Sequence, residues 1–88
     1  MPEISRFLGI IIRMFYNDHN PPHFHVVYGD HEAALCIETL QVIEGELPAR
    51  VKGLVVEWAT LHQKELIENW MLCTRKENQS YKKIKPLV

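Results

Sequence analysis

Residues 23–38, HFHVVYGDHEAALCIE, consist of two apolar-rich runs separated by the dipeptide Gly29-Asp30. Glycine readily adopts the positive φ that a two-residue hairpin turn requires, so the segment predicts a β-hairpin with its turn at this dipeptide. The turn fixes which residues face each other on the two strands: Tyr28 with His31, Val26 with Ala33, Phe24 with Leu35 and His23 with Cys36. Side chains alternate across a strand, so His23 and His25 are expected on the face opposite the core.

The segments on either side of the hairpin are also rich in apolar residues. Isoleucine and aromatic residues fill residues 4–16, which predicts one central strand covered on both faces. After Pro48 the apolar residues repeat with helical spacing, and they lose phase near His62, which predicts two consecutive helices. The expected elements are strands at 4–16, 23–28, 31–38 and 40–44, helices at 48–61 and 63–75, and a short strand at 81–84.

Strands followed by helices are typical of the α+β class. We therefore expect an N-terminal antiparallel sheet of about four strands, with the two C-terminal helices packed on one of its faces. The chain has 88 residues, of which 47% are hydrophobic and 24% charged, and this composition predicts one globular domain over residues 1–75. Residues 76–88 are expected to form a basic tail.

The charge of the chain is unevenly distributed. The net charge is −1, which excludes a strongly basic nucleic-acid coat protein. Residues 75–88 nevertheless carry five basic residues against one acidic residue, while residues 1–74 carry a net charge of −5. The tail is either a solvated terminus or a docking arm for nucleic acid or an acidic partner. The basic residues of such an arm are Arg75, Lys76, Lys82, Lys83 and Lys85.

The composition also constrains where the protein works. No apolar run approaches the roughly 20 residues that span a bilayer, and the N-terminus lacks the pattern of a secretory leader. We therefore expect a cytoplasmic protein that does not contact membranes. Cys36 and Cys73 are expected to be free thiols, since two cysteines do not form a disulfide framework.

The strongest candidate site lies in residues 17–25, NDHNPPHFH. His23 and His25 are two residues apart on the predicted strand, so both imidazoles point to the same side. His19 or Asp18, in the preceding loop, would supply a third ligand for a divalent metal such as zinc. The candidate metal ligands are therefore His19, His23 and His25.

Two other interpretations of these residues stay open. The histidines are polar side chains on a solvated sheet face, or they act as general acids and bases without a metal, in a hydrolase or ribonuclease. The candidate catalytic residues are Asp18, His19, His23 and His25. Arg13 lies in the apolar run before this block, so it pairs with a carboxylate, extends to the edge of the sheet or faces a ligand. Of these, we expect a pair with Asp18, Glu32 or Glu38.

Three segments together resemble a known family. They are PEISRFLGI at residues 2–10, FYNDHNPPHFHV at residues 15–26, and the pattern Trp58-x-x-x-His62-x-x-Glu65-Leu-x-x-Asn69-Trp70. The chain resembles the domain-of-unknown-function 4160 family of small bacterial proteins. The resemblance implies a two-gene module of the toxin–antitoxin or regulatory kind, because members are often encoded beside a second small protein. It transfers no catalytic residue.

Two functions are therefore predicted. The first is an interaction domain that binds a second small protein encoded nearby, self-associates, or contacts RNA or DNA through its basic tail. The second is a histidine-dependent hydrolase or ribonuclease that uses the histidine block, with or without a metal.

Overall fold

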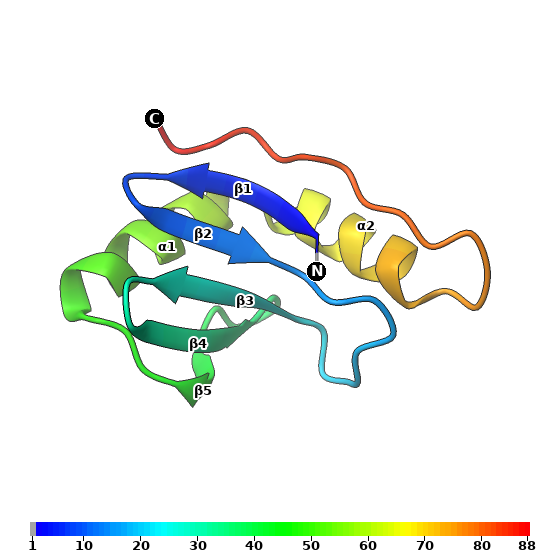
Figure 1. Ribbon diagram of the computed structural model, residues 1–88, viewed down its shortest axis with the longest axis horizontal. Helices are drawn as coiled ribbons and strands as arrows, with labels where there is room; N and C mark the ends of the chain where they lie inside the picture. The colour runs from blue at the N-terminus through cyan, green and yellow to red at the C-terminus, as the bar shows by residue number, and fades with distance from the viewer. Residues whose placement is uncertain (1) are drawn as a thin grey trace.

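The sheet has five strands in the order β1-β2-β3-β4-β5, and each strand is antiparallel to its neighbour (Figure 1). The computed structural model describes residues 2–88. The strands are β1 (Glu3–Phe7), β2 (Ile10–Arg13), β3 (His23–Tyr28), β4 (His31–Cys36) and β5 (Val42–Gly45). The helices are α1 (Ala49–Leu61) and α2 (Gln63–Thr74). The α+β architecture predicted from the sequence is confirmed, with one strand more than the expected four.

The additional strand arises because the predicted strand at 4–16 is wrong. Leu8 and Gly9, with φ of 50° and 77°, form a tight turn that divides this segment into β1 and β2. Positive φ at both central residues matches the right-handed twist of a hairpin. The run is apolar over most of its length because it supplies two neighbouring strands, and the side chain of Leu8 is exposed at the turn.

The β3–β4 hairpin has the register that its turn predicts. Tyr28 faces His31, Phe24 faces Leu35, and His23 faces Cys36 across the two strands. The helix-facing side of the sheet is consequently apolar, and its side chains pack with those of both helices. The buried core includes Ile4, Phe7, Ile10, Ile12, Phe24, Val26, Ala33, Leu35, Val51, Val55, Trp58 and Leu66.

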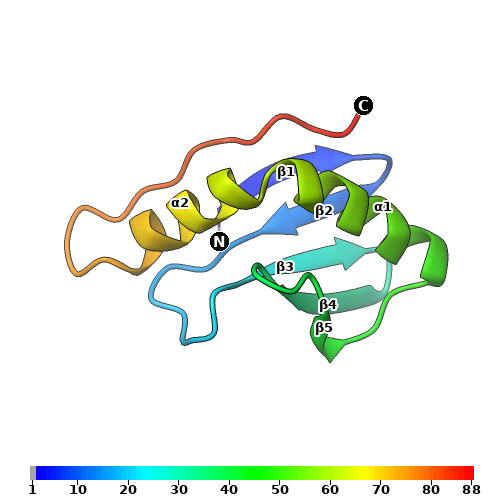
Figure 2. The ribbon, with the colours of Figure 1, turned by 180° about the vertical axis from the view of Figure 1, so that it is seen from behind.

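Both helices lie on one side of the sheet, as the view from behind shows (Figure 2). The break between them at His62 is confirmed, because its φ of −128° is not helical and its N–H donates to the carbonyl oxygen of Ala59. On the other side of the sheet, which we call the open face, no helix of residues 2–88 covers the strands (Figure 1). One row of this face runs across four strands through Arg13, His25, Ala34 and Glu44.

The C-terminal segment is packed against the domain. Residues 80–85, which we call the strap, run along β1 and α2 (Figures 1 and 2). The side-chain amide of Asn69, which is buried in α2, donates to the carbonyl oxygen of Lys82 at 2.9 Å and accepts from its N–H at 2.8 Å. One asparagine side chain thus replaces the two backbone hydrogen bonds that a neighbouring strand would provide.

Two further contacts hold the strap. The indole N–H of Trp58 donates to the carbonyl oxygen of Lys85 at 2.9 Å, and the N–H of Ile84 donates to the carbonyl oxygen of Ile4 at 2.8 Å. The side chain of Ile84 is buried. The predicted strand at 81–84 is wrong because side chains, rather than a continuous backbone ladder, bind this segment. A fully solvated terminus is likewise not what the structure shows.

The basic side chains of the tail stay at the surface. Arg75, Lys76, Lys82, Lys83 and Lys85 are all exposed. The ammonium of Lys83 donates to the carbonyl oxygen of Glu3 at 2.7 Å, and the guanidinium of Arg75 donates to that of Asn78 at 2.9 Å. Within residues 2–88, neither helix is long and apolar enough to cross a membrane.

We predict that Asn69→Ala destabilises the protein by about 1–3 kcal/mol, because it removes a buried side chain that satisfies two backbone groups of the strap. Urea unfolding measures this change. The control is Glu68→Ala, one residue earlier on the exposed side of α2, which should change the stability by less than about 0.5 kcal/mol. Equal effects of the two substitutions would show that the two hydrogen bonds of Asn69 to the strap contribute nothing to stability.

Candidate metal and histidine site

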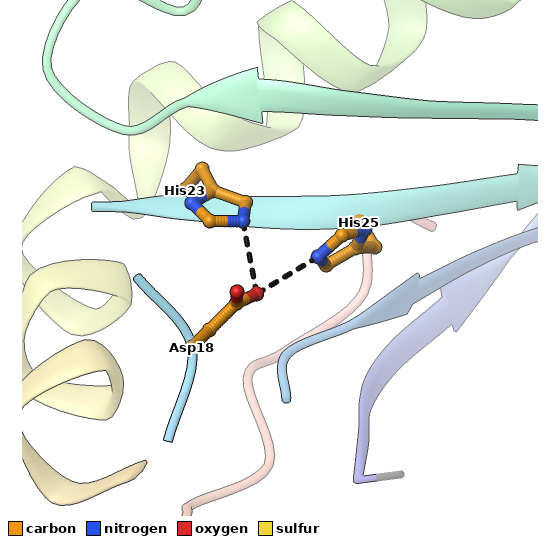
Figure 3. Close-up of side chains that lie close together, drawn as sticks. All are labelled: Asp18, His23 and His25. Carbon is orange, nitrogen blue, oxygen red and sulfur yellow. Dashed lines mark hydrogen bonds and ion pairs between the residues drawn. The ribbon is translucent and has the colours of Figure 1, made fainter. Parts of the chain in front are cut away.

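Asp18, His23 and His25 converge at one end of the open face (Figure 3). His23 and His25 point to the same side of β3, as their spacing predicts, and Asp18 reaches them from the loop between β2 and β3. Oδ2 of Asp18 lies 2.9 Å from Nε2 of His23 and 3.1 Å from Nε2 of His25. A single carboxylate oxygen therefore contacts both rings.

The loop that carries Asp18 is anchored at several points to other parts of the fold. The N–H of Asn17 donates to the carbonyl oxygen of Cys73 at the end of α2, at 3.1 Å. The side chain of Gln79 donates to the side chain of Asn17. Beyond the loop, the carbonyl oxygen of Pro22 accepts from the N–H of Ile37 at 3.0 Å. These contacts fix the position of the Asp18 backbone relative to β3.

The cluster is largely withdrawn from water. The side chains of His23, Asp18 and His25 are exposed by only 5%, 11% and 13%. The ring of Trp70 packs against His23 with 5.3 Å between the ring centroids. On the other side, Phe15 stacks on His25 with a centroid distance of 4.1 Å and an interplanar angle of 13°. Aromatic rings thus limit the rotation of both imidazoles.

The hydrogen bond on the other nitrogen of His23 determines its tautomer. Nδ1 lies 2.6 Å from the carbonyl oxygen of Pro21, and this oxygen can only accept, so Nδ1 carries a proton. A neutral His23 ring then directs the lone pair of Nε2 toward the side occupied by Asp18. A lone pair 2.9 Å from a carboxylate oxygen is repulsive unless a cation lies between them or the ring is protonated.

The environment favours the ionised form of Asp18. Burial opposes ionisation of this carboxyl group, but three other contributions outweigh it. They are the hydrogen bond from His25, the hydrogen bond from the backbone N–H of His19, and the charges of His23 and His25. Together they hold the pKa of Asp18 below its ordinary value. Asp18 is therefore a carboxylate at neutral pH.

The structure does not bring every predicted residue into the cluster. His19 contacts Asp18 through the other carboxylate oxygen, with Nδ1 3.0 Å from Oδ1, and its side chain is 89% exposed. Cys36 faces His23 across the strands as predicted, but within residues 2–88 the group of close ligand atoms contains only Asp18, His23 and His25. Of the alternatives for the third ligand, the geometry favours Asp18 over His19.

The expected pairing of Arg13 with Asp18, Glu32 or Glu38 is wrong. In the part of the chain that the structure describes, no carboxylate oxygen lies within 4.0 Å of its guanidinium. Arg13 instead lies between Glu3 and His25 in the register of the sheet. The position of Arg13 follows from the register of β2 against β3. The sequence did not predict this register, because the loop between the two strands is too long to determine it.

Two residues that hold the histidines were not predicted. Strand alternation could have predicted the contact of Phe15 with His25. Phe15 comes two residues after Arg13, so it lies on the same side of the chain, and Arg13 faces His25. Trp70 had no such signal, because its contact with His23 depends on how α2 crosses the end of the sheet. The sequence therefore indicated the polar members of the site better than their aromatic supports.

The cluster adjoins an open space on the surface. One side of His25 lines a hollow of about 320 Å³ on the open face, over β4 and β5. His25 is the only residue common to the cluster and the hollow among residues 2–88. A molecule in this hollow would therefore lie next to the Asp18–His25 pair.

A family model described as a domain of unknown function, DUF4160, matches residues 9–71. The chain belongs to the DUF4160 family. The match extends from the β1–β2 turn to α2 and includes Asp18, His23 and His25, so the predicted resemblance is confirmed. No curated protein and no solved structure matches the chain.

We predict that Asp18→Asn lowers the stability of the protein at pH 7, measured by urea unfolding in the presence of EDTA. The lowered pKa of Asp18 means that its carboxylate stabilises the folded state above the unfolded-state value of about 3.9. That stabilisation is lost as the pH falls through the folded-state pKa. The wild-type protein and the variant should therefore converge in stability as the solution is acidified toward pH 3.

The control for this measurement is Asp30→Asn, which alters an exposed carboxylate in the β3–β4 turn. It should leave the stability at pH 7 within about 0.5 kcal/mol of the wild type. A gap between the wild type and Asp18→Asn that stays constant from pH 7 to pH 3 would contradict the assigned role of the Asp18 carboxylate.

Proposed function

We propose that this DUF4160 protein binds a divalent transition-metal ion through Asp18, His23 and His25, and that zinc is the ion its donors suit best. The observation that carries the proposal is the convergence of one carboxylate oxygen and two imidazole nitrogens, all within 4.8 Å of one another. Two imidazoles with one carboxylate form a common ligand set for zinc and other first-row metals.

The hydrogen bond between His23 and Pro21 supports this assignment. A metal-bound histidine usually donates its other ring N–H to a carbonyl or carboxylate group, which fixes its tautomer and orientation. Nδ1 of His23 makes such a bond to the carbonyl oxygen of Pro21, so Nε2 is available as a ligand. A cation at this place would also remove the repulsion between the lone pair of Nε2 and the Asp18 carboxylate.

Hydrolysis is the chemistry that this set of residues supports. Sites with three protein ligands keep a coordination position open, and a zinc ion there lowers the pKa of its bound water to about 7. Asp18, His23 and His25 would hold the ion, while Phe15 and Trp70 keep the imidazoles oriented. The hollow beside His25 would hold a substrate next to these residues. His19, exposed at the rim, is the nearest additional group for proton transfer.

Metal titration tests the proposal directly. We expect the wild-type protein, purified without a metal-affinity step and treated with chelator, to bind one equivalent of Zn²⁺, or of Co²⁺ with the visible absorption of a nitrogen- and oxygen-ligated ion. Asp18→Ala, His23→Gln and His25→Ala should each weaken binding by about 100-fold or more, because each removes a ligand. His19→Ala and His31→Ala should stay within about threefold of the wild type.

His31 is the matched control because it is an exposed histidine on β4, away from the cluster. Circular dichroism of each variant separates the loss of a ligand from the loss of the fold. If the folded His25→Ala variant binds zinc as tightly as the wild type, or if the wild type takes up no metal, the cluster is not a metal site.

A second role, as the interaction component of a two-gene module, rests on different residues. The support for it is that the basic side chains of the tail stay exposed although the strap backbone is bound: Arg75, Lys76, Lys82, Lys83 and Lys85. An acidic partner protein or a nucleic acid would meet these five exposed basic side chains along residues 75–85.

Reversal of charge in the tail tests this second role. We expect Lys76→Glu combined with Lys85→Glu to weaken capture of the neighbouring gene product, or of RNA, by about tenfold at low salt. Lys52→Glu with Lys64→Glu, on exposed positions of α1 and α2, is the control with the same change in charge. Equal losses in the two double variants would assign the effect to net charge, and no binding of either ligand by the wild type would exclude the role.

A further inference from the structure

The hollow beside His25 exists because small residues, Ala34 and Gly45, form its floor. Ala34 lies at the centre of the open face of β4, and Gly45 ends β5 next to it. A Cβ atom at Gly45 would lie 2.1 Å from the carbonyl oxygen of Glu32, and its φ of +70° suits glycine. A larger residue is therefore excluded at this position, and the depression is a consequence of how β4 and β5 pair.

The outer wall of the hollow carries two carboxylates. Glu32 comes two residues before Ala34 on β4, and Glu44 faces Ala34 from β5, so both side chains rise from the open face. Both residues are exposed. In the described part of the chain, no basic or histidine side chain lies within 4.0 Å of either carboxylate. This differs from Glu3, which pairs with Arg6 at 2.7 Å.

The inner wall of the hollow is aromatic. Phe15 and His25 are stacked and line the side of the hollow nearest the cluster of Asp18, His23 and His25. The hollow therefore offers an apolar inner surface and two carboxylates at its outer rim. This arrangement matches a side chain with an aliphatic stem and a cationic head, because the stem packs on apolar surface while the head pairs with carboxylates.

We propose that this hollow receives an arginine or lysine side chain of a basic polypeptide partner. The guanidinium or ammonium group would lie between Glu32 and Glu44, and the methylene stem would pack on Ala34 and Phe15. The volume of about 320 Å³ accommodates one such side chain. The inference goes beyond the proposed metal site and does not require it, since neither glutamate belongs to the cluster.

The sign of the local charge separates this partner from a nucleic acid. With neutral histidines, the charges of Asp18, Glu32, Glu44 and Arg13, which faces His25, sum to −2 without an ion and to zero with a divalent ion held by Asp18. Phosphate groups would be repelled by the two carboxylates at the rim, Glu32 and Glu44, whereas a cationic side chain would be attracted by them.

The test is an NMR titration at 150 mM salt with an acetylated, amidated tetra-arginine peptide, on the metal-free protein and on protein with one equivalent of Zn²⁺. We expect saturable shifts of the amides of Phe15, Ala34 and Gly45 in both samples. Glu32→Gln combined with Glu44→Gln should weaken binding by about tenfold, because both charge-assisted contacts are lost. Glu57→Gln with Glu68→Gln, on exposed positions of the helices, should stay within about twofold of the wild type.

The control pair also removes two carboxylates from the protein. A difference between the two pairs therefore reports where the carboxylates lie and not how many there are. Equal weakening by the two pairs, or peptide-induced shifts that avoid the hollow, would overturn the proposal. An RNA octamer that shifts the same three amides would also overturn it, because a polyanion would then occupy the hollow. If the protein does not bind zinc, the titration of the metal-free protein still tests this proposal. The metal-site proposal and this one are thus tested separately.

Discussion

The register of the β3–β4 hairpin constrains both faces of the sheet at once. Because side chains alternate along a strand, the pairing that places Phe24 and Leu35 in the core also places His23 and His25 on the open face. A slip by one residue would bury two imidazoles under the helices and expose the apolar residues. The hydrophobic core and the candidate site therefore depend on the same turn at Gly29.

The third member of the site depends on contacts far along the chain. Asp18 is carried by a loop whose neighbour Asn17 bonds to Cys73 at the end of α2 and to Gln79 beyond it. The strap that follows is fixed to α2 through Asn69 and to β1 through Ile84. The C-terminal part of the chain thus packs against α2 and β1, and it also helps position the loop that carries Asp18.

The open face combines two features with different chemistry. The cluster of Asp18, His23 and His25 is enclosed and holds its polar atoms within reach of one another, as a metal site requires. The hollow over Ala34 is accessible, and in the described residues 2–88 no cationic side chain lies within 4.0 Å of the carboxylates at its rim. His25 connects the two, so occupation of the hollow would change the surroundings of the cluster. The family match covers both features, since it extends over residues 9–71.

The sequence by itself determined the features that depend on a few adjacent residues. The Gly29-Asp30 turn gave the register of β3 and β4, the shift of helical phase near His62 gave the break between α1 and α2, and the spacing of His23 and His25 put both rings on one side. Only the tertiary structure decided that Leu8 and Gly9 form a turn, since an apolar run with one glycine is compatible with one long strand. It also selected Asp18 over His19 as the third group and bound the tail through Asn69. The place of Asp18 and the binding of the tail depend on contacts between segments distant in the chain, whereas turns and periodicity are set by a few adjacent residues.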